Sequence, residues 1–269
     1  MLKIYNVAEA SASILRRENA LELQVPEVIQ TGIRQIFGED LTPGEAVAKL
    51  LGDVQKRGDA ALREWSSKID GASGKSLVIE KEQIETAVSR IPSDLHEALK
   101  KAADRIRQFH SLQPVPAWTT TEMGGVLGQR FTPIQRVGVY VPGGTAPLPS
   151  SLLMSAIPAQ VAGVTEITVA TPPGRSGADV PDIILATAAI AGVETIYTVG
   201  GALAVAAFAF GTETVGKVDK IVGPGNLFTT LAKRQVYGIV GIDGLFGPTE
   251  TAVVADASAN PAWVAADLL

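Results

Sequence analysis

The sequence predicts an α/β protein in which a parallel sheet follows a helical N-terminal region. Between residues 137 and 256, short β-branched runs alternate with apolar helical segments, a pattern typical of a parallel sheet covered on both faces. Residues 1–113 are instead rich in charges and show helical periodicity. The proline-rich segment 113–118 separates the two parts. We expect a helical region with a short strand at 1–134, the sheet domain at 135–248, and the start of a further α/β segment at 249–269.

Composition limits the function classes. The chain has 269 residues, and its 46% hydrophobic content with 27 Gly and 16 Pro indicates a globular protein. A net charge of −5 gives no electrostatic reason to bind nucleic acid or an anionic membrane. The absence of cysteine excludes disulfides and zinc–thiolate sites. With no signal-peptide layout at its N-terminus and no apolar run of membrane-spanning length, the chain is expected to be soluble and cytoplasmic.

The N-terminal helices are marked by capping residues. Thr42, Pro43 and Glu45 form a capping box with proline at the first helical position, and this helix is expected to stop near Gly58. Asp59 is expected to cap the next helix. Further along we expect a short apolar strand at 77–79, a helix at 81–90, and a helix from a Ser93 cap to about 112.

The chain has two histidines, His96 and His110, both in the last of these helices. They are fourteen residues apart, which is about 21 Å at 1.5 Å per residue, so they cannot share one metal ion. Neither has a second ligand at helical spacing. We therefore expect ordinary surface or packing residues, no metal site, and no Ser-His-Asp triad in the sheet domain.

The stretch 137–158 organises the sheet domain. Its apolar start predicts a buried strand, and Gly143 and Gly144 then permit a turn. Ser150 and Ser151 are expected to cap the following helix, which Pro158 should bend or interrupt. Such a strand, glycine turn and helix start can bind a ligand, but the same pattern also serves simple chain reversal.

The same theme repeats further on. We expect strands at 125–131, 164–171, 195–199, 220–222 and 251–254, and helices at 180–190, 202–210 and 227–237. Two more glycine turns follow strands: Gly200 with Gly201, and Gly223 and Gly225 with Asn226. Because turns after parallel strands lie at one edge of the sheet, the three turns together predict a ligand crevice. Neither Gly-x-Gly-x-x-Gly nor a Walker A motif occurs.

Several long motifs in order resemble the histidinol dehydrogenase family. They are Tyr-Val-Pro-Gly-Gly-Thr-Ala-Pro-Leu-Pro-Ser-Ser from Tyr140, Val-Gly-Gly-Ala from Val199, and Lys-Val-Asp-Lys-Ile-Val-Gly-Pro-Gly-Asn from Lys217. The resemblance covers the chain from about residue 40. It implies Rossmann-like domains in a cytoplasmic homodimer that oxidises L-histidinol to L-histidine through the aldehyde, with NAD and a bound zinc ion.

The resemblance also implies roles for individual residues. Tyr140 and Asn226 match positions that contact NAD, and Thr249 matches a substrate-binding serine. The alternative for Asn226 is that it only caps the helix beginning at Leu227, since asparagine is among the best N-caps. The glycines of the turns complete the expected NAD site: Gly143, Gly144, Gly200, Gly201 and Gly225. Leu203 replaces a glutamine that contacts NAD, and residues 244–246 (Gly-Leu-Phe) replace Met-Pro-Ala.

The family's zinc ligands and its acid–base pair match positions beyond the end of this sequence, so we expect neither a catalytic residue nor a metal ligand in this chain. One interpretation is a truncated histidinol dehydrogenase that is inactive alone. The alternative is a short non-catalytic paralog that binds a nucleotide or a protein partner, as the changes at Leu203 and 244–246 would favour.

Overall fold

A six-stranded sheet forms the centre of the molecule. The computed structural model describes residues 3–16, 25–74, 76–113, 116–143, 146–174, 177–246 and 251–268. The strands lie in the order β1-β6-β5-β4-β7-β8, and within this sheet all neighbours pair in parallel except β1 with β6. The strands are β1 (Val78–Ile79), β4 (Arg136–Tyr140), β5 (Glu166–Ala170), β6 (Thr195–Tyr197), β7 (Lys220–Val222) and β8 (Gly241–Ile242). The predicted α/β class, with a Rossmann-like parallel sheet, is confirmed.

The chain reverses its direction across the sheet after β6. Strands β4, β5 and β6 succeed one another outward, and the chain then crosses back past β4 to add β7 and β8 on the other side. Since these five strands are parallel, their carboxyl ends share one edge. The reversal lies between β4 and β7, which is where open α/β sheets bind ligands.

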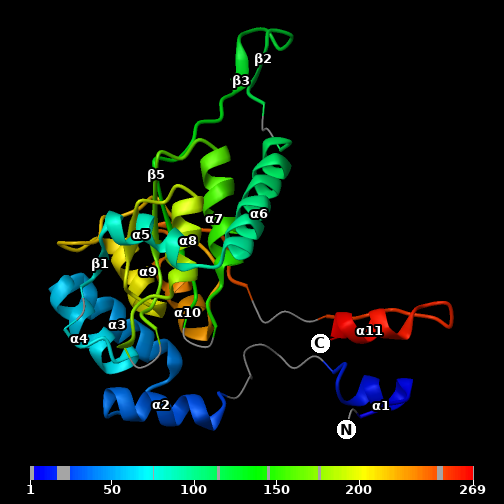
Figure 1. Cartoon of the computed structure of the whole chain (residues 1–269), viewed down its shortest axis with the longest axis horizontal. Coiled ribbons are helices and arrows are strands. Elements are labelled where there is room, and N and C mark those ends of the chain that lie inside the picture. Colours follow the sequence, from blue (N-terminus) through cyan, green and yellow to red (C-terminus); the bar gives the residue numbers. More distant parts are fainter. Residues whose placement is uncertain are drawn as a thin grey trace.

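Helices cover both faces of the sheet (Figure 1). One face carries α7 (Pro149–Val161) and α8 (Asp182–Ile190), with α5 (Lys81–Ala87), the 3₁₀ turn η1 (Val88–Arg90) and α6 (Ser93–Ser111) packed against them. The other face carries α9 (Gly201–Phe210) and α10 (Leu227–Val236), which are contacted by α3 (Pro43–Arg57). Helix α4 (Asp59–Asp70) packs beside α3 and α9. Each face therefore has its own hydrophobic cluster.

The remaining elements lie outside the two hydrophobic clusters of this core. They are α1 (Val7–Ala12), α2 (Glu27–Phe37), α11 (Pro261–Leu268) and a hairpin of β2 (Trp118–Thr120) and β3 (Leu127–Gln129), which projects from the body of the molecule (Figure 1). Within the described ranges, no helix has the length and hydropathy that a bilayer crossing requires.

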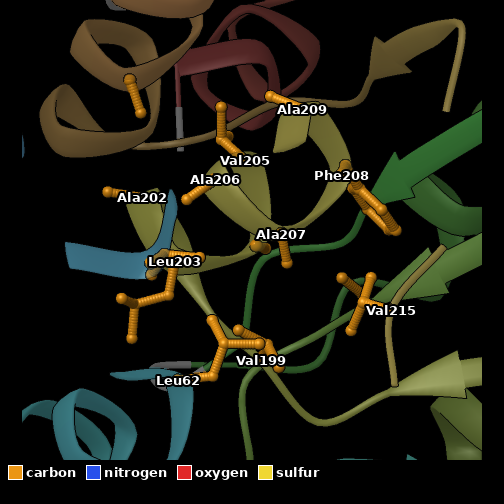
Figure 2. Close-up of a cluster of buried hydrophobic side chains, with 14 of the residues drawn as sticks. Leu62, Val199, Ala202, Leu203, Val205, Ala206, Ala207, Phe208, Ala209 and Val215 are labelled. Carbon is orange, nitrogen blue, oxygen red and sulfur yellow. The ribbon is translucent and has the colours of Figure 1, made fainter. Parts of the chain in front are cut away.

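Residues of β4 alternate between the two hydrophobic clusters. Val137 and Val139 belong to the cluster under α7 and α8, whereas Tyr140 belongs to the cluster of α9. Gly138 lies beneath the ring of Phe208, and a Cβ built on it would come within 2.6 Å of Cδ2 of that ring. Figure 2 shows Phe208 among the apolar side chains of α9. The missing side chain at 138 lets α9 approach the sheet closely enough to be buried on all sides.

The residues before 135 take part in this same architecture. Strand β1 pairs antiparallel with β6, and α3 packs on α9. The capping box at Thr42 is confirmed, because its Oγ1 accepts the Glu45 N–H while the Glu45 carboxylate accepts the Thr42 N–H. The predicted caps at Asp59 and Ser93 are wrong. Gly58 and Pro92 hold the cap positions, and the Asp59 carboxylate instead accepts hydrogen bonds from the N–H and hydroxyl of Thr214.

The start of α7 also differs from the prediction. Pro149 begins this helix and Leu148 precedes it without a side-chain cap, so neither Ser150 nor Ser151 has the capping role. Proline suits the first helical position because the N–H it lacks would have no partner there. Pro158 lies inside α7 without ending it, since the helix continues to Val161.

Two of the predicted strands differ from what the structure shows. The expected strand at 251–254 is absent, and the last strand is β8, which pairs with β7 at the sheet edge. A β-branched run becomes a strand only where a neighbouring strand pairs with its backbone, and none of the described strands pairs with 251–254. Within 125–131 a strand does form, but as β3 of the separate hairpin and not as part of the central sheet.

Candidate functional site

A pocket of about 510 Å³ opens at the carboxyl edge of the sheet. Residues that follow β4, β5 and β6 line it, and so does Asn226 before α10. Helices α2 and α4 contribute mostly apolar residues, among them Val28, Ile36 and Ile69. An apolar cavity of this size with a few polar groups is typical of a small-molecule site. The pocket therefore brings together the ends of all three glycine-containing turns.

Tyr140 ties the end of β4 to its neighbours. Its hydroxyl oxygen accepts the backbone N–H of Gly201 at 3.1 Å. Burial raises the pKa of this phenol above its ordinary value, so the side chain is neutral. A Cβ on Gly223, whose φ is +116°, would lie 2.1 Å from the Tyr140 carbonyl oxygen, which makes glycine necessary there. Tyr140 thus holds the second and third glycine turns at fixed distances from β4.

Gly143 and Gly200 leave space around Pro172. A Cβ on either glycine would lie 2.8 Å from the Pro172 ring, at Cγ and Cβ respectively. A side chain at either position would therefore displace the loop after β5 that lines the pocket. Both residues lie in turns after strands and line the pocket. Gly144 lies outside the described residues.

Asn226 caps α10. Its side-chain Oδ1 accepts the N–H groups of Phe228 and Thr229 at 3.1 and 3.2 Å. Gly225 comes before it, and a Cβ there would lie 2.4 Å from the Cβ of Thr229. Within the described part of the chain, the amide Nδ2 of Asn226 makes no hydrogen bond. The cap uses one end of this amide, and the other end is available at the edge of the pocket.

A buried ion pair braces the third turn, and the sequence analysis did not find it. Lys233 of α10 is 3% exposed, and its Nζ lies 2.7 Å from Asp243 Oδ1 and donates to the Gly223 carbonyl. Asp243 Oδ2 accepts the Gly223 N–H at 2.8 Å. The sequence offered no clear signal for this pair, because no strand was expected before Asp243 and Lys233 has the position of an ordinary lysine in the expected helix at 227–237. These contacts hold the backbone that precedes Asn226.

Asp70 is the second residue that sequence reasoning missed. It ends α4 and lines the pocket, and its Oδ2 is buried without a hydrogen-bond partner among the described residues. Burial raises the pKa of this carboxyl from 3.8 to about 6. A Cβ on Gly200 would lie 3.4 Å from Oδ2. Since nothing in the local sequence around Asp70 indicates a site, only its position in the fold identifies it.

The residues that depart from the family pattern have different positions. Leu203 lines the pocket and is 1% exposed. Leu245 and Phe246 are exposed, and Phe246 lines a separate hollow between α7 and β7. Thr249 lies outside the described residues. Of the two departures, only Leu203 therefore touches the pocket.

The described residues contain no cluster of three or more His, Asp or Glu side chains that could hold a metal ion. His96 and His110 both lie on α6, and neither is among the residues that line the pocket. The arrangement as described can hold an organic ligand and can offer it an amide donor and a carboxylate acceptor.

Comparisons with known proteins agree on one family. The model of the family described as histidinol dehydrogenase matches residues 39–269. Histidinol dehydrogenase of Deinococcus radiodurans is 47% identical over 268 residues, which are 100% of this chain and 60% of the relative. That of Pseudomonas putida is 50% identical over 228 residues, covering 83% of this chain and 51% of the relative. The crystal structure of histidinol dehydrogenase from Elizabethkingia anophelis superposes with a TM-score of 0.80 at 36% identity, covering 91% of this chain and 57% of that one. The chain thus spans between half and three fifths of the length of these relatives.

Proposed function

Because the chain belongs to the histidinol dehydrogenase family of oxidoreductases, we propose that it supplies the NAD-binding part of an enzyme that oxidises L-histidinol to L-histidine through the aldehyde. The observation that carries the proposal is the pocket at the carboxyl edge, whose lining includes Tyr140, Gly143, Gly200, Gly201 and Asn226. A cytoplasmic homodimer with Thr249 near the substrate belongs to the same proposal.

The residues present fit a dinucleotide. Gly143 and Gly200 keep the backbone bare where a Cβ would fill the space beside Pro172, and the buried Asp70 Oδ2 offers an acceptor without a partner. Bound NAD supplies the acceptor for a hydride. This chain's residues bind and orient it: the Asn226 amide can donate to it, and the apolar residues of α2 exclude water from the pocket.

Zinc does not fit the described residues in the same way. They include no cluster of three metal-binding side chains, and both histidines lie on α6. We therefore assign no step to zinc within this chain. Ligands for a zinc ion in the complete enzyme would have to come from elsewhere.

A second candidate function has one specific observation in its favour. Leu203 lines the pocket at the position where the resemblance implies a glutamine amide, and a leucine cannot form a hydrogen bond. A short paralog that binds a nucleotide or a protein partner without catalysis would tolerate that change. Binding of NAD to this chain is the property that separates the candidates most directly.

Calorimetric titration of NAD into the chain and three variants tests the proposal. Asn226→Ala removes both the cap and the free amide, whereas Asn226→Ser keeps a capping oxygen and removes only the amide. We expect both variants to bind NAD about tenfold more weakly, with Asn226→Ser retaining most of its stability. Leu203→Gln is expected to bind more tightly than the parent chain.

Equal affinity in the parent chain and Asn226→Ser would show that Asn226 is a cap and nothing more. No measurable binding of NAD to the parent chain or to any variant would overturn the NAD-binding proposal and leave the non-catalytic alternative.

A further inference from the structure

Asp70 has an uncompensated carboxylate in the nucleotide pocket. Its Oδ2 is buried and accepts no hydrogen bond within the described part of the chain. The described lining contains no lysine, arginine or histidine, and Tyr140 is its other ionisable side chain. The Tyr140 hydroxyl accepts the Gly201 N–H and makes no hydrogen bond with Asp70 Oδ2. A buried acceptor in this state is stabilised when a ligand donates to it.

The position of Asp70 is costly for the helix that carries it. It is the last residue of α4, and a negative charge at a helix C-terminus is disfavoured by the helix dipole. The other two acidic residues of α4 make ion pairs with basic residues of the same helix, Asp59 with Arg63 and Glu64 with Lys68. Asp70 has no such partner among the described residues, so helix stability does not explain its presence.

The place that Asp70 occupies is informative about the ligand. In dinucleotide-binding sheets, an acidic residue after the second strand accepts hydrogen bonds from a ribose diol. Here the second parallel strand, β5, is followed by Thr171, Pro172 and Pro173, with no acidic residue among them. A Cβ built on Gly200 would meet Pro172 Cβ at 2.8 Å and Asp70 Oδ2 at 3.4 Å, so the Asp70 carboxylate lies close to that strand end.

We infer that Asp70 accepts hydrogen bonds from the vicinal hydroxyls of the adenosine ribose and thereby selects a dinucleotide without a 2′-phosphate. This inference rests on the proposed binding of NAD. A carboxylate has two acceptor oxygens that match two adjacent hydroxyls, while a phosphate on the 2′-oxygen would remove a donor and add negative charge next to Asp70. The apolar residues of α2, including Ile29 and Phe37, line the same pocket and suit the adenine base.

Titrations of NAD, NADP and nicotinamide mononucleotide test the inference. The variants are Asp70→Asn, which keeps the shape and removes the charge, and Glu64→Gln as a matched control on the exposed side of α4. The parent chain and Glu64→Gln are expected to bind NAD about a hundredfold more tightly than NADP. In Asp70→Asn we expect NAD to bind about tenfold more weakly and the preference over NADP to shrink to a few-fold.

The possible failures are distinguishable. If the parent chain binds NAD and Asp70→Asn keeps the same preference for NAD over NADP, Asp70 does not bind the adenosine ribose. That result overturns this inference alone. The same holds if Asp70→Asn weakens the mononucleotide but leaves the NADP preference unchanged, because Asp70 would then face the other ribose. Absence of NAD binding in the parent chain would instead overturn the proposed function.

Discussion

Asp243 and Asp70 both lie at the carboxyl edge of the sheet, yet their surroundings differ. Asp243 Oδ1 lies 2.7 Å from the Lys233 ammonium, and the backbone N–H groups of Gly223 and Gly244 each donate to this carboxylate at 2.8 Å. Asp70 Oδ2, in the pocket beneath α2, has no donor within the described residues. One carboxylate is part of a closed hydrogen-bond network and the other is open.

The difference separates structural from ligand-directed polar groups. A buried carboxylate with a cation and backbone donors holds its turn in one conformation, since each partner would be left unsatisfied if the network opened. A buried carboxylate without partners lowers the stability of the free protein and gains donors only from a ligand. The β7–β8 end of the edge is therefore built to stay closed, and the β4–β6 end is built to receive a molecule.

The largest effect is expected from breaking the closed network. Lys233→Met should lower the free energy of unfolding by about 3–5 kcal/mol, because it leaves Asp243 and the Gly223 carbonyl buried without their cation. Urea denaturation followed by circular dichroism measures it. As a control, Lys49→Met breaks the exposed pair with Glu39 and should cost about 0–1 kcal/mol. Similar losses for the two variants would contradict the structural role of the Lys233 pair.

Neutralising the Asp70 carboxylate should have the opposite effect and raise the free energy of unfolding. The pKa of Asp70 is raised from 3.8 to about 6, so the folded chain holds a proton that the unfolded chain has released between these pH values. The contribution of Asp70 to the free energy of unfolding therefore falls as the pH rises from about 4 to about 6, and it stays low above that pH. Asp70→Asn should stabilise the ligand-free protein by up to about 3 kcal/mol at pH 8 and by little at pH 4.

Thermal or urea unfolding of the parent chain and Asp70→Asn at both pH values measures this difference. Comparing the two proteins cancels the other carboxyls, such as Asp53, whose pKa is lowered to about 2 chiefly by its hydrogen bond with Arg57. A variant that is less stable than the parent at pH 8 would mean that the carboxylate of Asp70 is satisfied after all.

Substitutions at two glycines, one in the packed sheet and one in the open pocket, test the same difference and should change the stability less. Gly138 belongs to the packed sheet, where an added Cβ would overlap Phe208, so Gly138→Ala should cost about 1–3 kcal/mol. Gly32 lines the open pocket within α2, and nothing lies within 4 Å of a Cβ there. Gly32→Ala should stabilise the protein by about 0.5–1 kcal/mol through helix propensity. Equal effects in unfolding experiments would mean that α2 packs as tightly as the sheet.

Local features of the fold were predictable because their causes lie within a few residues. The capping box of Thr42 and Glu45 and the cap at Asn226 each depend on side chains that reach the next turn of the same helix. The alternation of strands and apolar helices indicated a parallel sheet, and a parallel sheet brings the turns of Gly200 and Gly223 to one edge. The position of these turns beside the pocket therefore followed from the topology of the sheet.

Predictions that depended on a distant partner were less successful. The run at 251–254 has strand-forming residues but forms no strand, because none of the described strands pairs with it. Asp59 resembles a helix cap, yet its carboxylate binds Thr214. In both cases the local signal was real, and pairing with another part of the chain, or its absence, decided the outcome.

The sequence by itself determined the family, the alternation of strands and helices between residues 137 and 237, and the glycine turns that follow the parallel strands. Only the tertiary structure showed that Asp70 of α4 reaches the pocket, that α2 lines it, and that Lys233 pairs with Asp243 behind the third turn. The physical reason is that burial and hydrogen-bond satisfaction depend on which segments pack together, and an aspartate in a helical sequence has the same appearance whether its carboxylate ends in water, in an ion pair or in an empty pocket.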